Sequence, residues 1–75
     1  MHLEDDQAAL ADFTQVIALD PNNAKAYYNR GNIHVRLKDA KAALADYRKA
    51  ADLYQQQGEP SAYHETLNHI KALQR

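Results

Sequence analysis

The chain contains no cysteine, so it can form neither a disulfide framework nor a thiolate metal site. Its 75 residues include only two glycines and two prolines, which leaves few turn signals and favours helix through most of the length. No stretch approaches the roughly 18 apolar residues that a membrane-spanning helix needs, and the acidic first residues do not resemble a secretory signal. We therefore expect a soluble, helical protein with no membrane contact, and we place it in the cytoplasm.

The charges of the chain are nearly balanced. Nine lysines and arginines stand against ten aspartates and glutamates, which gives a formal net charge of -1. A chain with this balance has no electrostatic field that would attract nucleic acid or an anionic lipid surface. We therefore expect no nucleic-acid partner.

The clearest positive feature is an internal repeat. The segment AALADF at residues 8–13 returns as AALADY at residues 42–47, a spacing of 34 residues, and the register continues to Leu19 and Leu53. A fixed period of this length is typical of stacked helical units, each of which buries its apolar face only against its neighbours. The repeat therefore predicts a helical solenoid, and it favours binding over catalysis.

Start and stop signals divide the chain into four helices, near residues 5–19, 24–37, 40–56 and 61–73. Asp5 and Asp39 are suited to cap the first and the third helix. Pro21 stops the first helix because proline cannot continue it, and Gly58 with Pro60 breaks the third. No strand is predicted.

A pattern of aromatic, glycine and alanine residues runs through residues 24–57, carried by Tyr27, Gly31, Ala43, Tyr47 and Ala50. With this pattern the segment resembles a tetratricopeptide repeat, a helix-turn-helix unit of 34 residues. In such a unit Gly31 and Ala43 add no bulk where the two antiparallel helices come closest, and aromatic side chains fill the wider space beside them. Arg30 stands where the family often has leucine, and we expect its stem to cover apolar surface while its guanidinium reaches water.

The resemblance implies an all-α fold, an antiparallel helix-turn-helix solenoid of the tetratricopeptide type, in a single domain over residues 1–75. Residues 1–23 correspond to the second helix of a truncated repeat, and residues 24–57 to a complete repeat. Residues 58–75 then form a capping helix, because Leu67 stands where Gly31 does and would block the close approach of a following helix. The chain looks like one and a half repeats with a cap.

The residues that could carry chemistry do not form a catalytic set. His64 and His69 are five residues apart, which places them on different faces of a helix, and no further ligand completes a metal site. We expect His69 to pair with Glu65 one turn earlier, and Asp5 and Asp6 to favour the start of the first helix. No nucleophile or glycine-rich loop accompanies them. The sequence therefore predicts no enzyme, no catalytic residue, no metal and no cofactor.

The candidate binding residues lie on the face of the second helix that internal packing does not use. Four residues share that face at helical spacing: Tyr28, Asn32, Val35 and Arg36. In the proteins that this chain resembles, the same face lines a concave groove that holds peptides, and an aromatic ring, an amide and a guanidinium suit this role. Lys25 and Asn29 fall at offsets that some repeats of the family use to clamp a peptide carboxylate. The alternative is that these residues only face solvent or touch a neighbouring repeat.

Two functions remain open from the sequence. In the first, the groove residues bind a peptide or protein partner of unknown identity, so the chain is a non-catalytic interaction module. In the second, the chain is an assembly element. Leu10, Phe13 and Ile17 belong to a helix whose own partner helix is missing, so their apolar surface is expected to bring copies together in a homo-oligomer.

Overall fold

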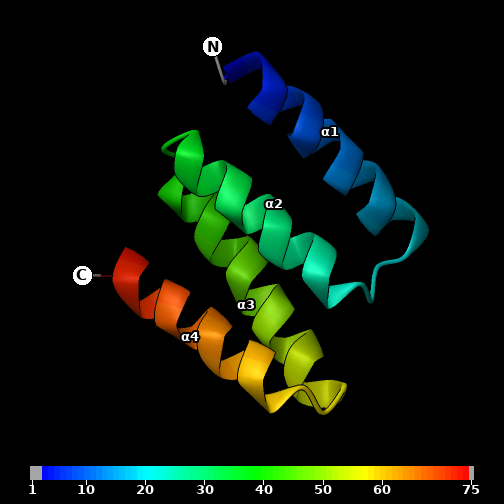
Figure 1. The fold of residues 1–75 in the computed structure, drawn as a ribbon, viewed down its shortest axis with the longest axis vertical. Helices are drawn as coiled ribbons and strands as arrows, with labels where there is room; N and C mark the ends of the chain where they lie inside the picture. Colours follow the sequence, from blue (N-terminus) through cyan, green and yellow to red (C-terminus); the bar gives the residue numbers. More distant parts are fainter. Residues whose placement is uncertain (1–2, 75) are drawn as a thin grey trace.

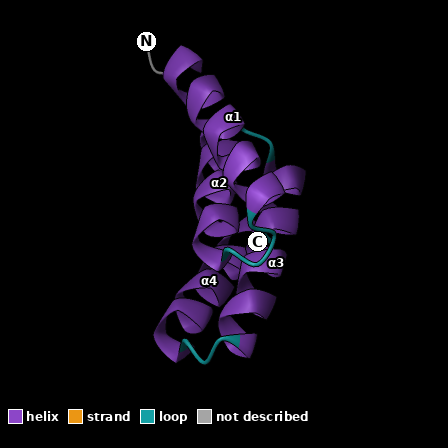
Figure 2. Cartoon of the chain, turned by 90° about the vertical axis from the view of Figure 1, so that its right-hand side faces the viewer, coloured by secondary structure: helices purple, strands orange, loops and turns teal. Residues whose placement is uncertain are grey.

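The computed structural model describes residues 3–74, and these form four α-helices stacked in chain order (Figure 1). The helices are α1 (Leu3–Leu19), α2 (Ala24–Arg36), α3 (Ala40–Gln56) and α4 (Pro60–Leu73). Each packs mainly on the helix next to it in the sequence, and short turns join antiparallel neighbours (Figure 2). No strand occurs in residues 3–74, so the predicted all-α solenoid of about four helices is confirmed. None of these helices has both the length and the apolar character needed to cross a bilayer.

The helix boundaries agree with the prediction to within two residues. The largest difference is at the start of α1, which begins at Leu3, so Asp5 lies inside the helix and the prediction that it caps α1 was wrong. Asp39 does cap α3, because its carboxylate accepts a hydrogen bond from the Ala42 backbone N–H at 3.1 Å. Asn23 caps α2 in the same way through the Ala26 N–H.

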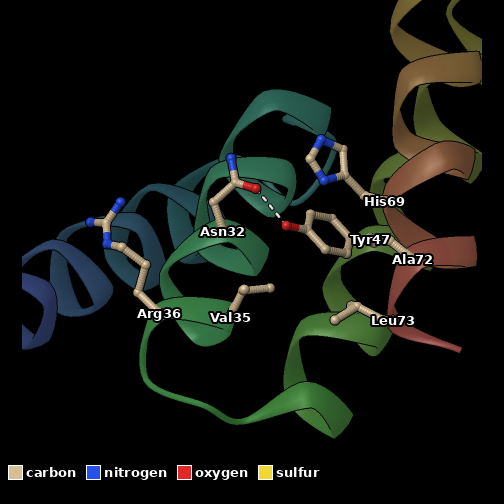
Figure 3. A pocket seen from close by; sticks show the side chains of 7 residues that line it. All are labelled: Asn32, Val35, Arg36, Tyr47, His69, Ala72 and Leu73. Atoms are coloured by element: carbon tan, nitrogen blue, oxygen red, sulfur yellow. Dashed lines mark hydrogen bonds between the residues drawn. The ribbon is translucent and has the colours of Figure 1, made fainter. Parts of the chain in front are cut away.

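Gly31 of α2 lies directly against the ring of Tyr47 of α3. A Cβ atom added to Gly31 would lie 2.8 Å from Cε1 and 2.9 Å from Cδ1 of Tyr47, which is too close for two carbon atoms. Tyr47 has no room to move aside, because it is buried, its hydroxyl donates to Asn32 Oδ1, and its ring stacks on His69 (Figure 3). Position 31 therefore requires glycine, as predicted, but the side chain that lies against it is Tyr47, which the sequence analysis had placed in the wider space beside the contact.

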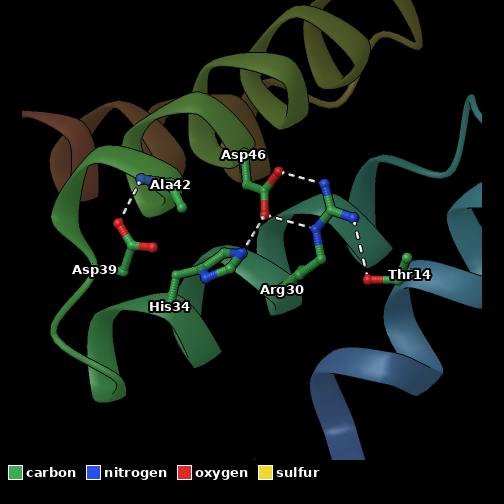
Figure 4. Close-up of polar contacts among 6 residues, drawn as sticks. All are labelled: Thr14, Arg30, His34, Asp39, Ala42 and Asp46. Atoms are coloured by element: carbon green, nitrogen blue, oxygen red, sulfur yellow. Dashed lines mark hydrogen bonds and ion pairs between the residues drawn. The ribbon is translucent and has the colours of Figure 1, made fainter. Parts of the chain in front are cut away.

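A polar cluster joins the first three helices. Asp46 of α3 is buried and accepts two hydrogen bonds from Arg30 of α2, Nε to Oδ2 at 2.8 Å and Nη2 to Oδ1 at 2.7 Å (Figure 4). Arg30 Nη1 also donates to Thr14 Oγ1 of α1 at 3.3 Å, and His34 Nε2 lies 3.5 Å from Asp46 Oδ2. The side-chain hydrogen bond to Asp46 raises the pKa of the Arg30 guanidinium.

This cluster corrects the sequence-based expectation for Arg30. The guanidinium does not simply reach water, because the carboxylate of Asp46 lies within hydrogen-bond distance. A buried carboxylate needs a cation or several donors, and the paired N–H groups of arginine match both of its oxygens. Arg30 therefore holds α2 against α3 through a directed pair of hydrogen bonds as well as through its stem.

Replacing Gly31 by alanine should lower the free energy of unfolding by about 1–3 kcal/mol, because the added methyl group overlaps the Tyr47 ring. Urea denaturation followed by circular dichroism measures this difference. In a Tyr47→Leu background the ring is gone, so the same Gly31→Ala change should cost less. Equal costs in the two backgrounds would contradict the assigned contact.

Replacing Asp46 by alanine should destabilise the fold by about 2–3 kcal/mol, since Arg30 then lacks its partner but keeps some contact with water. The double variant Arg30→Met/Asp46→Leu removes both charges and should unfold within about 1 kcal/mol of the wild type. Thermal and urea unfolding of the three proteins test this pair. A double variant as unstable as Asp46→Ala would show that the ion pair is not the cause.

Candidate binding groove

A pocket of about 370 Å³ opens between α2 and α4, and α3 forms its floor (Figure 3). Seven residues line it: Asn32, Val35, Arg36, Tyr47, His69, Ala72 and Leu73. Three of them, Asn32, Val35 and Arg36, come from the face of α2 that the sequence singled out. We call this pocket the groove.

The two walls of the groove are built in the same way. On α2 the lining residues stand at positions 32, 35 and 36, and on α4 at positions 69, 72 and 73. Both sets have the spacing i, i+3 and i+4, which places three side chains on one face of a helix. Tyr47 rises from α3 between the two walls and closes the bottom.

The groove has an apolar centre and a polar edge. Val35 is exposed and Leu73 is half-buried, and their side chains point toward one another across the pocket (Figure 3). Asn32 and His69 lie together on one side of this apolar centre (Figure 3). Such a site can enclose an apolar group and orient it through neighbouring polar atoms.

The amide of Asn32 is held by the floor of the groove. Its Oδ1 accepts the hydrogen bond from the Tyr47 hydroxyl, so the amine of the same side chain points away from Tyr47 (Figure 3). That amine makes no hydrogen bond within residues 3–74. The stacked ring of His69 fixes Tyr47 from the other side, with centroids 5.2 Å apart. Asn32 is therefore an oriented donor at the groove edge.

The hydroxyl of Tyr28 joins α2 to α4. It donates to Glu65 Oε2 at 3.1 Å and lies 2.8 Å from His69 Nε2. One hydroxyl proton cannot serve both groups, so when Tyr28 donates to Glu65 its contact with His69 requires an Nε2–H donor on the imidazole. Burial, reinforced by the hydrogen bond to Glu65, raises the pKa of Tyr28 to about 12. The expected direct pair of His69 and Glu65 was wrong, because both side chains bind Tyr28 instead.

Arg36 is bound by a carboxylate of the same chain. Its Nε and Nη2 atoms donate to Oδ1 of Asp6 at 3.1 and 2.6 Å, and these hydrogen bonds join α1 to the last residue of α2. Asp6 is buried, whereas the side chain of Arg36 remains 58% exposed. Asp6 was expected only to favour the start of α1, but it also forms an ion pair with Arg36, 30 residues further along the chain. A ligand carboxylate at Arg36 would have to share it with Asp6.

The remaining residues singled out from the sequence lie outside the groove. Lys25 is exposed and Asn29 is half-buried, and neither lines the pocket. The residues proposed for self-association, Leu10, Phe13 and Ile17, are half-buried on α1. No three histidine, aspartate or glutamate side chains in the described part of the chain are placed to hold a metal ion.

Sequence reasoning missed the α4 wall and two exposed apolar residues of α1, Val16 and Leu19. His69, Ala72 and Leu73 repeat the spacing of the α2 wall, but the last helix was considered only as a cap. Among the residues of α1 whose burial the structure describes, Val16 is 38% exposed and Leu19 is 78% exposed. The 34-residue register that pairs Leu19 with Leu53 could have identified the second of these.

The chain is similar to known repeat proteins over most of its length. A family model described as a TPR repeat matches residues 3–38, and a second, described as a tetratricopeptide repeat, matches residues 24–59. Serine/threonine-protein phosphatase T of Trypanosoma brucei brucei is 38% identical over 55 residues, which cover 73% of this chain and 12% of that protein.

Two further relatives match this chain at similar identity over a short part of their length. The DnaJ homolog subfamily C member 7 homolog of Dictyostelium discoideum is 34% identical over 59 residues, 79% of this chain and 11% of that protein. Peptidyl-prolyl cis-trans isomerase FKBP4 of Homo sapiens is 36% identical over 47 residues, 63% of this chain and 10% of that protein. The chain thus spans about a tenth of the length of each relative.

Replacing Tyr28 by phenylalanine should lower the free energy of unfolding by about 1 kcal/mol, because the hydroxyl that joins α2 to α4 is lost. Urea denaturation at neutral pH measures the change. Tyr63→Phe is the matched control, since the Tyr63 hydroxyl makes no hydrogen bond within the described residues. If Tyr28→Phe lowers the free energy of unfolding no more than Tyr63→Phe does, the Tyr28 hydroxyl does not stabilise the contact between α2 and α4.

The same variant should change the response to alkaline pH. The pKa of Tyr28 is raised from 10.0 to about 12, so the unfolded chain releases this proton first. The contribution of Tyr28 is therefore complete below pH 10 and is lost as the pH rises toward about 12. Stability measured across this window should fall less steeply in Tyr28→Phe than in the wild type. Parallel curves would contradict the shifted pKa.

Proposed function

The chain belongs to the tetratricopeptide repeat family, and on that premise we propose that the groove between α2 and α4 binds a peptide segment of a partner protein. Repeats of this family are non-catalytic folds that mediate protein–protein interaction. The observation that supports the groove as the site is its combination of an apolar centre with an oriented amide donor at the edge that makes no hydrogen bond within residues 3–74.

In this proposal one apolar side chain of the peptide lies between Val35 and Leu73. The cavity volume of about 370 Å³ suits a leucine or phenylalanine together with part of its backbone. The amine of Asn32 donates to a backbone carbonyl of the peptide next to that residue. Arg36 can bind an acidic group of the peptide, in competition with Asp6.

The printed names of two relatives are consistent with a polypeptide ligand. A serine/threonine-protein phosphatase and a peptidyl-prolyl isomerase both act on polypeptides, and this chain matches a short part of each.

We also propose the division of the chain into a second helix of a truncated repeat at 1–23, a complete repeat at 24–57 and a capping helix at 58–75. The helix within 58–75, α4, then both packs on α3 and forms the second wall of the groove. Lys25 and Asn29 would extend the site toward the start of α2.

Association of copies into a homo-oligomer is a second candidate function. Leu19 of α1 is 78% exposed and Val16 is 38% exposed, beside the half-buried Leu10, Phe13 and Ile17. Apolar side chains grouped on one helix favour contact with another surface. Light scattering from micromolar to millimolar concentration tests for the homo-oligomer, and a constant monomer mass over this range would rule out self-association.

The groove proposal predicts that Val35→Ser/Leu73→Ser weakens binding at least about tenfold while the melting temperature changes little, because Val35 is exposed and Leu73 half-buried. The probe is a peptide selected by the wild-type chain from a random peptide display library, with affinity measured by calorimetry. Lys49→Ala, an exposed position on α3, is the control.

A second variant separates the two roles of Asn32, whose amine is the proposed donor to the peptide and whose oxygen accepts the hydrogen bond from Tyr47. Asn32→Asp keeps an oxygen that can accept the Tyr47 hydrogen bond but removes the amine, so it should weaken binding without unfolding the chain. If the selected peptides bind Val35→Ser/Leu73→Ser and Asn32→Asp as tightly as they bind the wild type, the peptide-binding site is not the groove.

A further inference from the structure

Two unpaired nitrogen atoms lie at one edge of the groove. One is the amine of Asn32 on α2, the other is Nδ1 of His69 on α4, and neither makes a hydrogen bond within residues 3–74. No buried side-chain nitrogen or oxygen in this part of the chain lacks a partner, so both atoms are open to solvent. Both side chains line the groove, on the same side of its apolar centre (Figure 3).

The contacts of Tyr28 determine which kind of group His69 offers to a ligand. The Tyr28 hydroxyl donates its one proton to Glu65 Oε2, so its 2.8 Å contact with His69 Nε2 requires an N–H on that nitrogen. A neutral imidazole carries a single N–H, which leaves a lone pair on Nδ1. His69 therefore presents an acceptor at the groove edge, whereas Asn32 presents a donor.

The ring of His69 is held in this orientation by its neighbours. It stacks on the ring of Tyr47 with centroids 5.2 Å apart, and it meets the ring of Tyr28 edge-on at 5.3 Å. A half-turn of the imidazole would place a carbon atom at the Tyr28 hydroxyl and lose the contact of Nε2. Nδ1 is therefore an oriented acceptor.

We propose that His69 is a second specificity-determining residue of the groove, an inference that rests on the peptide-binding function proposed above. Its Nδ1 accepts the backbone N–H of the peptide residue whose carbonyl accepts the amine of Asn32. In an extended chain the N–H and C=O of one residue point to the same side. In a helical peptide these groups are already bonded within the helix. The groove therefore binds an extended segment and excludes proline at the residue that Asn32 and His69 hold.

The protonation of the imidazole can be measured without a ligand. Nitrogen-15 chemical shifts of the labelled side chain distinguish a protonated ring nitrogen from an unprotonated one. At about pH 8, where histidine is ordinarily neutral, we expect an unprotonated Nδ1 and a protonated Nε2 in His69. A protonated Nδ1 beside an unprotonated Nε2 would overturn the proposal.

The probe for the N–H contact is a peptide selected by the wild-type chain from a random display library. Its backbone amides are replaced one at a time by esters, each of which removes one N–H and keeps the side chain. One ester should weaken binding to the wild type about three- to tenfold. The same ester should cost much less with His69→Phe, which keeps an aromatic ring beside Tyr47 but has no nitrogen.

Two variants serve as matched controls. Tyr28→Phe loses the same contact between α2 and α4 as His69→Phe does but keeps Nδ1, so the ester should cost as much as in the wild type. In His69→Asn the side-chain oxygen can replace Nδ1 as the acceptor, so part of the cost of the ester should return. An ester also weakens its own carbonyl as an acceptor. A cost that Asn32→Asp removes and His69→Phe does not would therefore contradict the N–H contact.

The pH dependence of binding gives an independent readout. Both nitrogens of an imidazolium are donors, so affinity for a selected peptide without acidic side chains should fall between about pH 8 and about pH 5 as His69 gains a proton. The other titratable groups around the ring are Tyr28 of α2, Tyr47 of α3 and Glu65 of α4, and Arg36 lines the same groove. Burial raises the pKa of both tyrosines, which stay neutral in this range. His69→Phe keeps these four groups, and equal falls in the two proteins would overturn the proposal.

Failure of this inference differs from failure of the function on which it rests. If Val35→Ser/Leu73→Ser weakens binding but no ester is coupled to His69→Phe, the peptide lies in the groove without the His69 contact, and the inference is wrong. If Val35→Ser/Leu73→Ser leaves the affinity unchanged, the peptide binds elsewhere, and the proposed function fails together with the inference.

Discussion

The close contact of Gly31 with the ring of Tyr47 is the constraint on which the rest of the structure depends. It sets the distance between α2 and α3 and holds Tyr47 upright between α2 and α4. From that position the Tyr47 hydroxyl orients Asn32 and its ring supports His69, so one packing contact also shapes the floor of the groove. Fold and candidate site are therefore built from the same residues, and a change at position 31 affects both.

The fold could be predicted from the sequence because its signals are local. The 34-residue register, Pro21 and the Asp39 cap act within a few residues of the boundaries that they determine. Gly31 was also assigned correctly, since glycine within a helix costs stability unless close packing requires it. One local signal failed: Asp5 has the chemistry of a cap, but α1 begins two residues earlier.

The polar contacts could not be predicted in the same way, because each joins residues far apart in the sequence. Arg30 and Asp46 are 16 residues apart, and Tyr28 and His69 are 41 apart. Helical spacing places a side chain on a face, but the partner on a neighbouring helix depends on the rotation of that helix. Helical spacing placed Tyr28 on the groove face of α2, but it could not show that the Tyr28 hydroxyl contacts Glu65 and His69 of α4.

The linear order of the helices has a consequence for local opening. α2 packs mainly on α1 and α3, and α3 packs on α2 and α4, whereas α1 packs mainly on α2 and α4 mainly on α3 with the Tyr28 contacts to α2 besides. In such an array a terminal helix detaches at the cost of one interface, while an inner helix leaves only when two interfaces break. Backbone amides of α2 and α3 should therefore exchange with solvent more slowly than those of α1 and α4. The AALADF and AALADY segments, almost identical in sequence, would then differ in amide protection only because of their neighbours.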